Sequence, residues 1–433
     1  MDSSNHVPYP VGKNNEASTV PKERSVCTSI GKSPFLRDYL VRLKCYFDDS
    51  NDFNHAYAAL QSTPVVYTIP SLDKAKHVQD VIIQHRCNVV CLVAPLGAKT
   101  VSQLSVVKLL LQAEPDAVVR SDNVTYHVEF LLHLHVTRCQ KRQSRNTDDH
   151  LIASCLPIWY DCKNHVGFEM EYFPAGTLSD LSDSVDADER LRLLRDVAKG
   201  LEFLNSLHII HFDVKCSNVC VGFRKDGKRM AKLIDLGSAK FVGQQLDRHC
   251  TQGDTPAYSP PEIFARTWEH GWKESTAAEP EPDWYPASPQ SDSWRLGLVV
   301  FEVMSDKKKV LWKVAHERDM FFSSFVRANL MGTARTGGSR RRMNLVFPGV
   351  DVSRLPACAN TLMANLLCLK PDDRLTFQEV VQEIEQHLGE TAAQAADASV
   401  AAQNGTIASS DQANQSGSRR SRVLNFLSSC SCL

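Results

Sequence analysis

Hydrophobic and polar positions divide the chain into a polar start, a strand-rich part, a helix-rich part and a polar end. Residues 1–33 show no periodicity, so we expect them to be disordered. Apolar residues then recur at helical spacing and predict helices over residues 35–47 and from Ser71 to Ile82. Together these helices form a predicted extension, residues 34–86, that packs on the following domain.

Three apolar runs come next and predict strands over Asn88–Val93, Thr100–Leu104 and Ser105–Leu111. A helical stripe begins after Asp122, a plausible N-cap residue, and includes Val124, Val128, Leu131 and Leu132. The basic stretch from Arg138 to Arg145 is expected to be a solvated, mobile loop. Two further strands are expected, one around Ile158 and Trp159 and one over Val166–Tyr172.

Helical periodicity dominates the second half of the chain. A helix is predicted from Asp186 to Leu207, opened by a capping box, and another over Trp294–Met304. The second helix is apolar on nearly all sides, so it should be buried. The Pro-rich and acidic insertion Arg266–Gln290 should be a surface loop, and the last helices should lie within Val352–Leu388.

Composition is that of an ordinary globular protein, with 43% hydrophobic and 23% charged residues. The net charge of -1 gives no general attraction to nucleic acid or to membranes. There are 14 cysteines, without a Cys-x-x-Cys pair that would suggest zinc, and the N-terminus lacks a signal-peptide pattern. We therefore expect reduced thiols and an intracellular protein, cytoplasmic or nuclear.

The C-terminal stretch 389–433 is rich in Ala, Gln and Ser, and we expect a disordered tail. Its end carries Cys430 and Cys432, which fit a prenylation box only loosely. Peripheral membrane attachment is therefore expected only if these cysteines are lipidated.

Candidate chemistry is concentrated in one polar loop between apolar flanks, His211-Phe212-Asp213-Val214-Lys215-Cys216-Ser217-Asn218. Its spacing brings a carboxylate, an ammonium and an amide onto one short loop. A carboxylate can accept a hydroxyl proton, an ammonium can neutralise a transferring phosphoryl group, and an amide can ligate a metal. A second carboxylate follows in Asp235-Leu236-Gly237, after an apolar run.

This pair of motifs resembles the catalytic loop and the Asp-Phe-Gly motif of eukaryotic protein kinases. Further motifs stand in the order of that family: Met170–Leu178 like its hinge, Thr255–Glu262 like the end of its activation segment, Asp292–Gly297 and Pro371–Thr376. Residues 259–266 are also similar to herpesvirus-type kinases. The resemblance implies an α+β, two-lobed fold over residues 87–388, with the small lobe in 87–172 and the large lobe in 173–388.

The resemblance also implies roles for the loop residues. Asp213 would orient the substrate hydroxyl and accept its proton, and Lys215 would stabilise charge on the γ-phosphate. Asn218 and Asp235 would hold Mg²⁺, and ATP would be the phosphoryl donor.

Nucleotide contacts are implied in the small lobe and the hinge. Gly97, in the connection 94–101, is the candidate for the glycine-rich turn over the phosphates. Lys108 is the candidate phosphate lysine, with Lys99 as the alternative, and Glu129 would pair with Lys108. Counting four residues on from Glu129, where the family has an apolar residue, gives His133.

In the hinge, Met170 would be the gatekeeper, and the backbone around Glu171 and Phe173 would bind adenine.

Two further expectations concern the large lobe. Phe212 stands where the family commonly has an arginine that receives a phosphate, which implies activation without phosphorylation of the activation segment. Glu262 and Arg374 should form a buried ion pair.

Two functions remain open at this point. The first is an active serine/threonine protein kinase acting on protein substrates, as a monomer and without a nucleic-acid partner. The second is a pseudokinase, a binding or scaffold module that keeps the fold without turnover. The four polar groups of Asp213, Lys215, Asn218 and Asp235 favour activity, whereas the single glycine of the phosphate turn favours the alternative.

Overall fold

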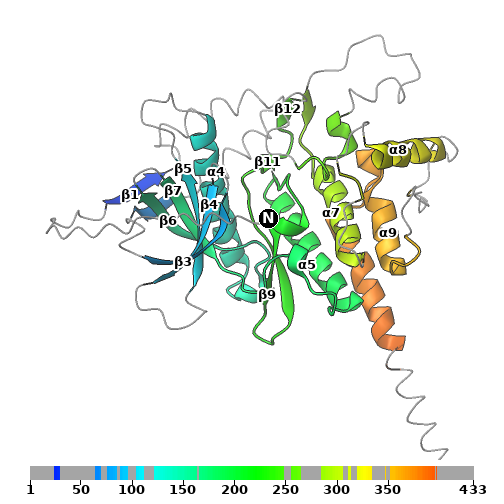
Figure 1. Ribbon diagram of the computed structural model, residues 1–433, viewed down its shortest axis with the longest axis horizontal. Helices are drawn as coiled ribbons and strands as arrows, with labels where there is room; N and C mark the ends of the chain where they lie inside the picture. The colour runs from blue at the N-terminus through cyan, green and yellow to red at the C-terminus, as the bar shows by residue number, and fades with distance from the viewer. Residues whose placement is uncertain are drawn as a thin grey trace, which may run out of the picture.

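The protein folds into a β-rich small lobe and a larger, mostly helical lobe, as the computed structural model shows (Figure 1). This arrangement confirms the predicted two-lobed α+β class. The structure describes residues 24–29, 64–69, 76–84, 88–95, 104–111, 121–162, 165–247, 255–264, 284–305, 311–313, 319–333, 347, 352–394 and 396.

A seven-stranded sheet forms the small lobe, in the order β1-β2-β6-β7-β5-β4-β3. All neighbouring pairs are antiparallel except β2 and β6. The strands are β1 (Arg24–Ser29), β2 (Pro64–Ile69), β3 (Lys76–Gln84), β4 (Asn88–Pro95), β5 (Ser105–Leu111), β6 (Cys155–Cys162) and β7 (His165–Glu171). The expected strands over 88–93, over 105–111, around 158 and over 166–172 are thus confirmed, whereas 100–103 lies outside the described residues.

The helix expected from Ser71 to Ile82 is wrong, because residues 76–84 form strand β3. Two register shifts in its pairing with β4 explain the misleading pattern. Val78, Val81 and Gln84, three residues apart, stand opposite Val93, Cys91 and Val89, which are two residues apart. Bulges of this kind stretch the two-residue period of a strand toward the three-residue spacing typical of a helix.

The disorder expected for residues 1–33 is wrong for residues 24–29. They form β1 and pair over their whole length with β2, from Arg24 opposite Ile69 to Ser29 opposite Pro64. Pairing with a distant strand leaves no local periodic signal over so short a segment, which is why composition alone suggested disorder. The disordered tail expected over 389–433 is wrong for residues 389–394, which continue the last helix. Residues 397–433 and the helix expected over 35–47 lie outside the described residues.

Helix α4 (Ser121–Gln143) is longer than the sequence pattern suggested. It begins at Ser121, so Asp122 lies inside the helix and is not its N-cap. The basic residues Arg138 to Arg142, expected in a mobile loop, occupy its last turns. They are good helix formers and lie near the negative end of the helix dipole, where positive charge is favourable.

The large lobe is built on helices α5 (Ala187–Ser206), α7 (Pro289–Met304), α8 (Met320–Thr333) and α9 (Ala357–Leu366), followed by helical residues 377–394. Asp186 caps α5 by accepting from the Glu189 N–H at 2.7 Å, while the Glu189 side chain bonds Arg229 instead of completing a capping box. As predicted, α7 is buried over nearly its whole length. Its apolar side chains form the centre of the main core, which confirms its role as the buried helix of this lobe.

Short strands carry the loops that face the small lobe (Figure 1). These strands are β8 (Ile209–Ile210), β9 (Val219–Phe223), β10 (Arg229–Leu233), β11 (Lys240–Phe241), β12 (Gln245–Asp247) and β13 (Trp284–Pro286). The last pair corrects part of the expected surface loop, because Trp284 in the insertion pairs with Asp247. No helix in the described ranges is both long and apolar enough to cross a lipid bilayer.

Candidate active site

A buried carboxylate on α7 fixes the backbone of the loop that follows β8. Asp292 accepts from the His211 N–H at 2.7 Å and from the Phe212 N–H at 2.9 Å. The His211 ring bonds the Ile234 carbonyl at 2.9 Å. Phe212 has a φ of 64°, a conformation that costs free energy for a bulky side chain and is typical of functional loops. The α7 helix therefore holds the loop in a shape it would not adopt alone.

Asp213 lies at the centre of the polar groups of this loop. Its Oδ2 accepts from Lys215 Nζ at 2.7 Å and from Asn218 Nδ2 at 2.8 Å. Its Oδ1 accepts from the Thr255 hydroxyl at 2.7 Å, and Lys215 Nζ also donates to that hydroxyl at 2.9 Å. The structure thus brings together the predicted catalytic pair, one predicted metal ligand and the threonine of the downstream motif.

Asp235 follows β10 and lies beside this group. The Ile234 N–H donates to the Asn218 carbonyl at 3.0 Å, which joins the segments that carry the two predicted metal ligands. Asp235 has a φ of 63°, and its Oδ1 accepts from the Gly237 N–H at 3.1 Å. The backbone of this turn therefore directs one carboxylate oxygen toward its own loop and toward the small lobe.

Lys108 on β5 reaches across from the small lobe to both carboxylates. Its Nζ lies 2.8 Å and 3.0 Å from the two Glu129 oxygens and 3.0 Å from Asp235 Oδ1. The predicted pair between Lys108 and Glu129 is thus present in the structure. Glu129 is fully inside the small lobe, and Lys108 is only 8% exposed. The ammonium thus links helix α4 to the Asp235 turn.

The pKa values of these buried groups shift in different directions. Burial raises the pKa of Glu129 to about 7, against the attraction of Lys108. Burial disfavours the charged form of Lys108 too, but the two carboxylates outweigh it and raise the pKa of Lys108. Burial also acts on Asp235, yet Lys108 and the Gly237 amide hold the pKa of Asp235 well below its usual range. The ionised form is thus favoured more strongly at Asp235 than at Glu129, which suits the metal ligand predicted at Asp235.

The predicted hinge residues lie at the end of β7 and directly after it. Met170 is buried in the main core, opposite Val106 of β5. The Glu171 side chain turns to Lys232 of β10, whose Nζ donates to it at 2.7 Å, and to the Ser154 N–H at 3.1 Å. Phe173 is also buried, and the Lys232 ammonium lies 5.6 Å from its ring centre. The structure places these three predicted residues on one segment that joins the lobes.

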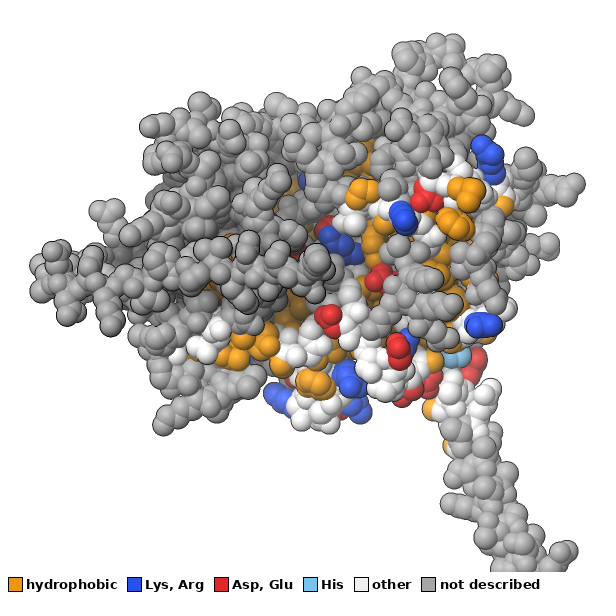
Figure 2. All heavy atoms as spheres, in the orientation of Figure 1, with side chains coloured by type: hydrophobic (Ala, Val, Ile, Leu, Met, Phe, Trp, Pro, Cys, Tyr) orange, Lys and Arg blue, Asp and Glu red, His pale blue; other side chains and the backbone are white. Residues whose placement is uncertain are grey.

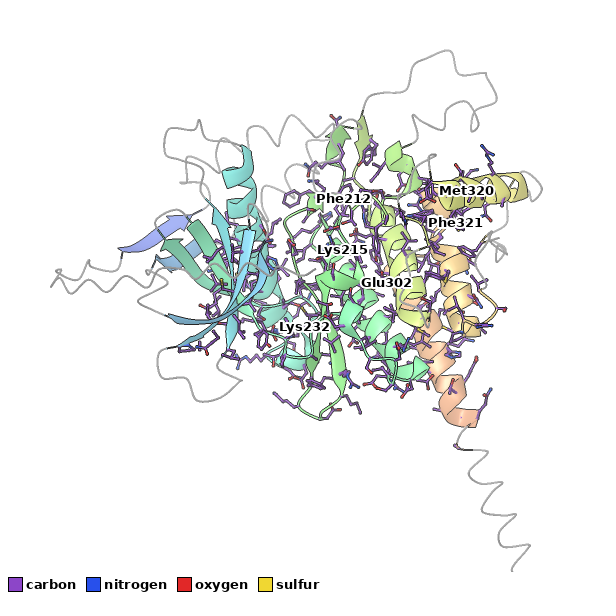
Figure 3. All side chains as sticks on the ribbon, in the orientation of Figure 1. Phe212, Lys215, Lys232, Glu302, Met320 and Phe321 are labelled. Carbon is purple, nitrogen blue, oxygen red and sulfur yellow. The ribbon has the colours of Figure 1, made fainter. Side chains whose placement is uncertain are left out.

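Lys232 is a further charged residue at the hinge that is not among the residues predicted from the sequence. Lys232 is only 3% exposed and donates to the carboxylate of Glu171, which lies 61 positions earlier in the chain (Figure 3). A signal was present, because a lysine inside the apolar run Ala231–Ile234 must find an anionic partner when the strand is buried. The identity of that partner could not be read from the sequence.

The strand pairing shows that the phosphate turn was predicted in the wrong connection. Because β3 pairs with β4, the first hairpin is closed by residues 85–87, whereas Gly97 lies in the connection between β4 and β5. Gly97 therefore does not stand where the resemblance requires a glycine-rich turn. The sequence of the 85–87 connection, His-Arg-Cys, contains no glycine. Gly97 and Lys99 themselves lie outside the described residues.

Phe212 points into an apolar cluster formed with Ile210, Ile263, Tyr285 and Ala287. The Arg295 guanidinium lies 4.4 Å from the centre of its ring, and the Lys240 ammonium lies 5.8 Å from it. Figure 3 shows the phenyl ring above Lys215, on the side of the β12–β13 pair. Phe212 thus connects its loop to Ile263 and Tyr285 by apolar contacts and to Arg295 and Lys240 by cation–π contacts.

Glu262 and Arg374 form the predicted ion pair of the large lobe. The two guanidinium nitrogens donate to the two carboxylate oxygens at 2.8 Å and 2.7 Å. Arg374 is 5% exposed, and it also bonds the carbonyls of Cys368 and Gln290 at 2.8 Å and 2.9 Å. The predicted pair is therefore confirmed, with Arg374 buried and Glu262 partly exposed.

The donor set suits a magnesium ion that arrives with a polyphosphate. Among the described residues no cluster of three His, Cys, Asp or Glu side chains could hold a metal by itself. One ionised carboxylate, Asp235, and one amide, Asn218, lie on adjoining segments instead. Mg²⁺ is commonly held by one or two carboxylates together with substrate phosphates and water, so these residues fit that ion.

Charged side chains gather where the two lobes meet. Figure 2 shows a basic and an acidic side chain near the centre of the drawn face, where Figure 1 places the loops of the large lobe. Figure 3 places Lys215 in this region. The group formed by Asp213, Lys215, Asn218, Asp235 and Lys108 can therefore accept a proton, bind a cation and neutralise phosphate charge in one place.

Comparison with known proteins agrees with this geometry. A family model described as "Protein kinase domain" matches residues 144–384. Mitogen-activated protein kinase kinase 7 of Arabidopsis thaliana is 29% identical over 160 residues, covering 37% of this chain and 46% of that protein. Serine/threonine-protein kinase SBK1 of Mus musculus is 27% identical over 242 residues, covering 55% of this chain and 50% of that protein.

Serine/threonine-protein kinase ArnS of Sulfolobus acidocaldarius is 27% identical over 238 residues, covering 50% of this chain and 34% of that protein. The chain spans at most about half the length of these three relatives. The family match begins at residue 144, after helix α4, so it covers the hinge and the large lobe but not strands β3 to β5.

Proposed function

Because this chain belongs to the protein kinase domain family, we propose that it is an ATP- and Mg²⁺-dependent serine/threonine protein kinase. The observation that carries the proposal is the hydrogen-bonded group of Asp213, Lys215 and Thr255. Proteins are the proposed substrates, and a serine or threonine hydroxyl is the proposed acceptor. The names of the relatives given above support this substrate class.

Each of these residues has one role in the proposed mechanism. Asp213 orients the acceptor hydroxyl and takes its proton, and Lys215 stabilises the charge that develops on the transferred phosphoryl group. Asn218 and Asp235 would hold Mg²⁺, which neutralises phosphate charge when bound. Lys108 contacts phosphate oxygens and is oriented for this by Glu129. The backbone at Glu171 and Phe173 receives the adenine, beside Met170.

The test of this proposal is phosphoryl transfer by the purified protein. With ATP and Mg²⁺, the full chain should phosphorylate a generic Ser/Thr substrate, and the Asp213→Ala variant should not. Absence of transfer by the wild-type protein, under conditions in which it binds ATP, would instead support the second candidate.

That second candidate is a pseudokinase that acts as a binding or scaffold module. The glycine-free connection 85–87 favours it, because glycines allow backbone N–H groups to approach the phosphates closely. The intact set of Asp213, Lys215, Asn218 and Asp235 favours turnover. ATP affinity and turnover, measured on one preparation, separate the two candidates.

The phosphate lysine can be identified by substitution. We expect Lys108→Met to lower turnover by about 100-fold, because Glu129 and Asp235 hold the Lys108 ammonium in place and a well-positioned charge contributes strongly to catalysis. Lys99→Met should lower turnover only a few-fold. Initial rates at saturating substrate check both variants, and the exposed Lys225→Met, on the β9–β10 turn, serves as the control. The reverse ranking would assign the role to Lys99, and near-wild-type rates in both would exclude either lysine.

Activity should not require phosphorylation of the activation segment. Phe212 cannot bind a phosphate, and its contacts with Ile263, Tyr285 and Arg295 hold the region instead. We therefore expect phosphatase-treated protein to keep its rate within about twofold. The measurement is the initial rate before and after treatment, with loss of phosphate verified by mass spectrometry. A loss of rate that returns on rephosphorylation would contradict this expectation.

A further inference from the structure

Helix α4 contacts the Asp235 turn at a second point, one helical turn beyond Glu129. His133 is fully buried, and its Nε2 accepts from the Leu236 backbone N–H at 3.2 Å. Since Nε2 accepts, the proton of the neutral ring lies on Nδ1. That Nδ1 is buried and has no hydrogen-bond partner among the described residues.

The protein therefore keeps a polar ring at a site that favours an apolar one. Phe168 lies 5.9 Å away, between ring centres, and apolar side chains of α4 on either side of His133 belong to the main core. Burying an N–H without a partner costs free energy, so packing alone does not account for histidine here. The compensating interaction is the hydrogen bond to Leu236.

The ring also stays neutral at this position. Burial lowers the pKa of His133 to about 3, and the positive charge of Lys108 acts in the same direction. Its Nε2 lies 4.0 Å from Glu129 Oε1, outside the range of a hydrogen bond. The imidazole consequently acts as an acceptor for the backbone amide and not as a second cation beside Glu129.

Glu129 and His133 then reach one turn by two routes. Glu129 acts through Lys108, whose ammonium bonds the Asp235 side chain, and His133 bonds the amide of the very next residue. The backbone at Asp235 has a positive φ of 63°, a conformation that needs support from its surroundings. A hydrogen bond to the adjoining amide supplies such support, because it fixes the peptide plane between Asp235 and Leu236.

We propose that His133 is a positioning residue, which couples helix α4 to the orientation of Asp235 through the Leu236 amide. The inference rests on the proposed function, because it treats Asp235 as the ligand of the nucleotide-bound Mg²⁺. It adds a direct connection from α4 to the metal-binding turn, independent of the Lys108 side chain.

The test compares three variants of the full chain. His133→Leu keeps an apolar volume and removes the acceptor. His133→Gln carries an oxygen that reaches about as far as Nε2, and His133→Asn is one methylene shorter and should not reach. Two quantities are measured for each: the Kd of ATP with and without Mg²⁺, and the amide hydrogen exchange of the peptide containing Leu236 in the nucleotide-free protein.

We expect His133→Leu and His133→Asn to weaken Mg²⁺-dependent ATP binding about tenfold, and to raise exchange at Leu236 about tenfold. ATP binding without Mg²⁺ should change less than twofold, and His133→Gln should restore both quantities. A purely structural histidine would give equal effects with and without Mg²⁺, which would overturn the inference. Unchanged exchange in both His133→Leu, which has no acceptor, and His133→Asn, whose acceptor is too short to reach, would overturn it as well.

Failure of the proposed function would give a different result. If wild-type protein bound no ATP, the assignment of Asp235 would fail, whereas the exchange comparison would still report the His133–Leu236 bond. If His133→Leu did not fold, the comparison of His133→Asn with His133→Gln would decide, because both variants keep a polar amide side chain at the same site.

Discussion

Asp213→Asn should lower phosphoryl transfer by about 10²–10⁴-fold while ATP binding stays within a few-fold of wild type. The substitution keeps the size of the side chain but removes its charge and its basicity. It also replaces an acceptor by a donor facing Lys215, Asn218 and Thr255, which all donate to Asp213. Single-turnover rates at saturating ATP measure the effect directly.

Two comparisons make this result specific. Asp235→Asn should weaken Mg²⁺-dependent ATP binding as well as transfer, because it removes the ionised predicted metal ligand. Ser217→Ala, an exposed change on the same loop, should leave both quantities unaltered. Turnover of Asp213→Asn close to the wild-type rate would show that the base is elsewhere.

Arg374→Met should destabilise the large lobe by about 3–5 kcal/mol, because it leaves Glu262 without its bidentate partner. The guanidinium also satisfies the carbonyls of Cys368 and Gln290, and it lies 5.1 Å from the centre of the Trp294 ring. Methionine can fill part of the volume but can satisfy none of these acceptors. Denaturant unfolding, followed by tryptophan fluorescence, measures the loss.

Arg192→Met is the matched control for this experiment. Arg192 is exposed on α5 and lies 3.9 Å from Asp188, so its removal should cost at most about 1 kcal/mol. Equal losses in the two variants would mean that the Glu262–Arg374 pair contributes no more than a surface pair, contrary to its burial.

The sequence predicted the large lobe well because its signals are local. Asp213, Lys215 and Asn218 lie within six residues of one another, so a single loop conformation brings them together. The buried face of α5 and the apolar character of α7 are likewise visible within one helix. The pair of Glu262 and Arg374 is distant in sequence, and it was predicted from the family resemblance and not from periodicity.

The small lobe was predicted less well because its order depends on partners far along the chain. The β3 strand carries bulges that imitate helical spacing, and β1 is defined only by its pairing with β2. Because residues 76–84 were predicted as a helix, the first hairpin was assigned one strand too far along the chain. The role expected for Gly97 was therefore wrong. Lys108 and Glu129 were nevertheless identified, because the apolar run around Lys108 resembles the lysine-bearing strand of the family and Glu129 lies on the helix that follows.

The attachment of the loop after β8 to α7 has a consequence for heat inactivation. Burial raises the pKa of Asp292, against the charge of Arg295, yet its two oxygens bond the His211 and Phe212 amides. The loop thus depends on a helix that forms the centre of the main core. We therefore expect this loop to show no independent transition at lower temperature and to lose its structure only when the large lobe unfolds.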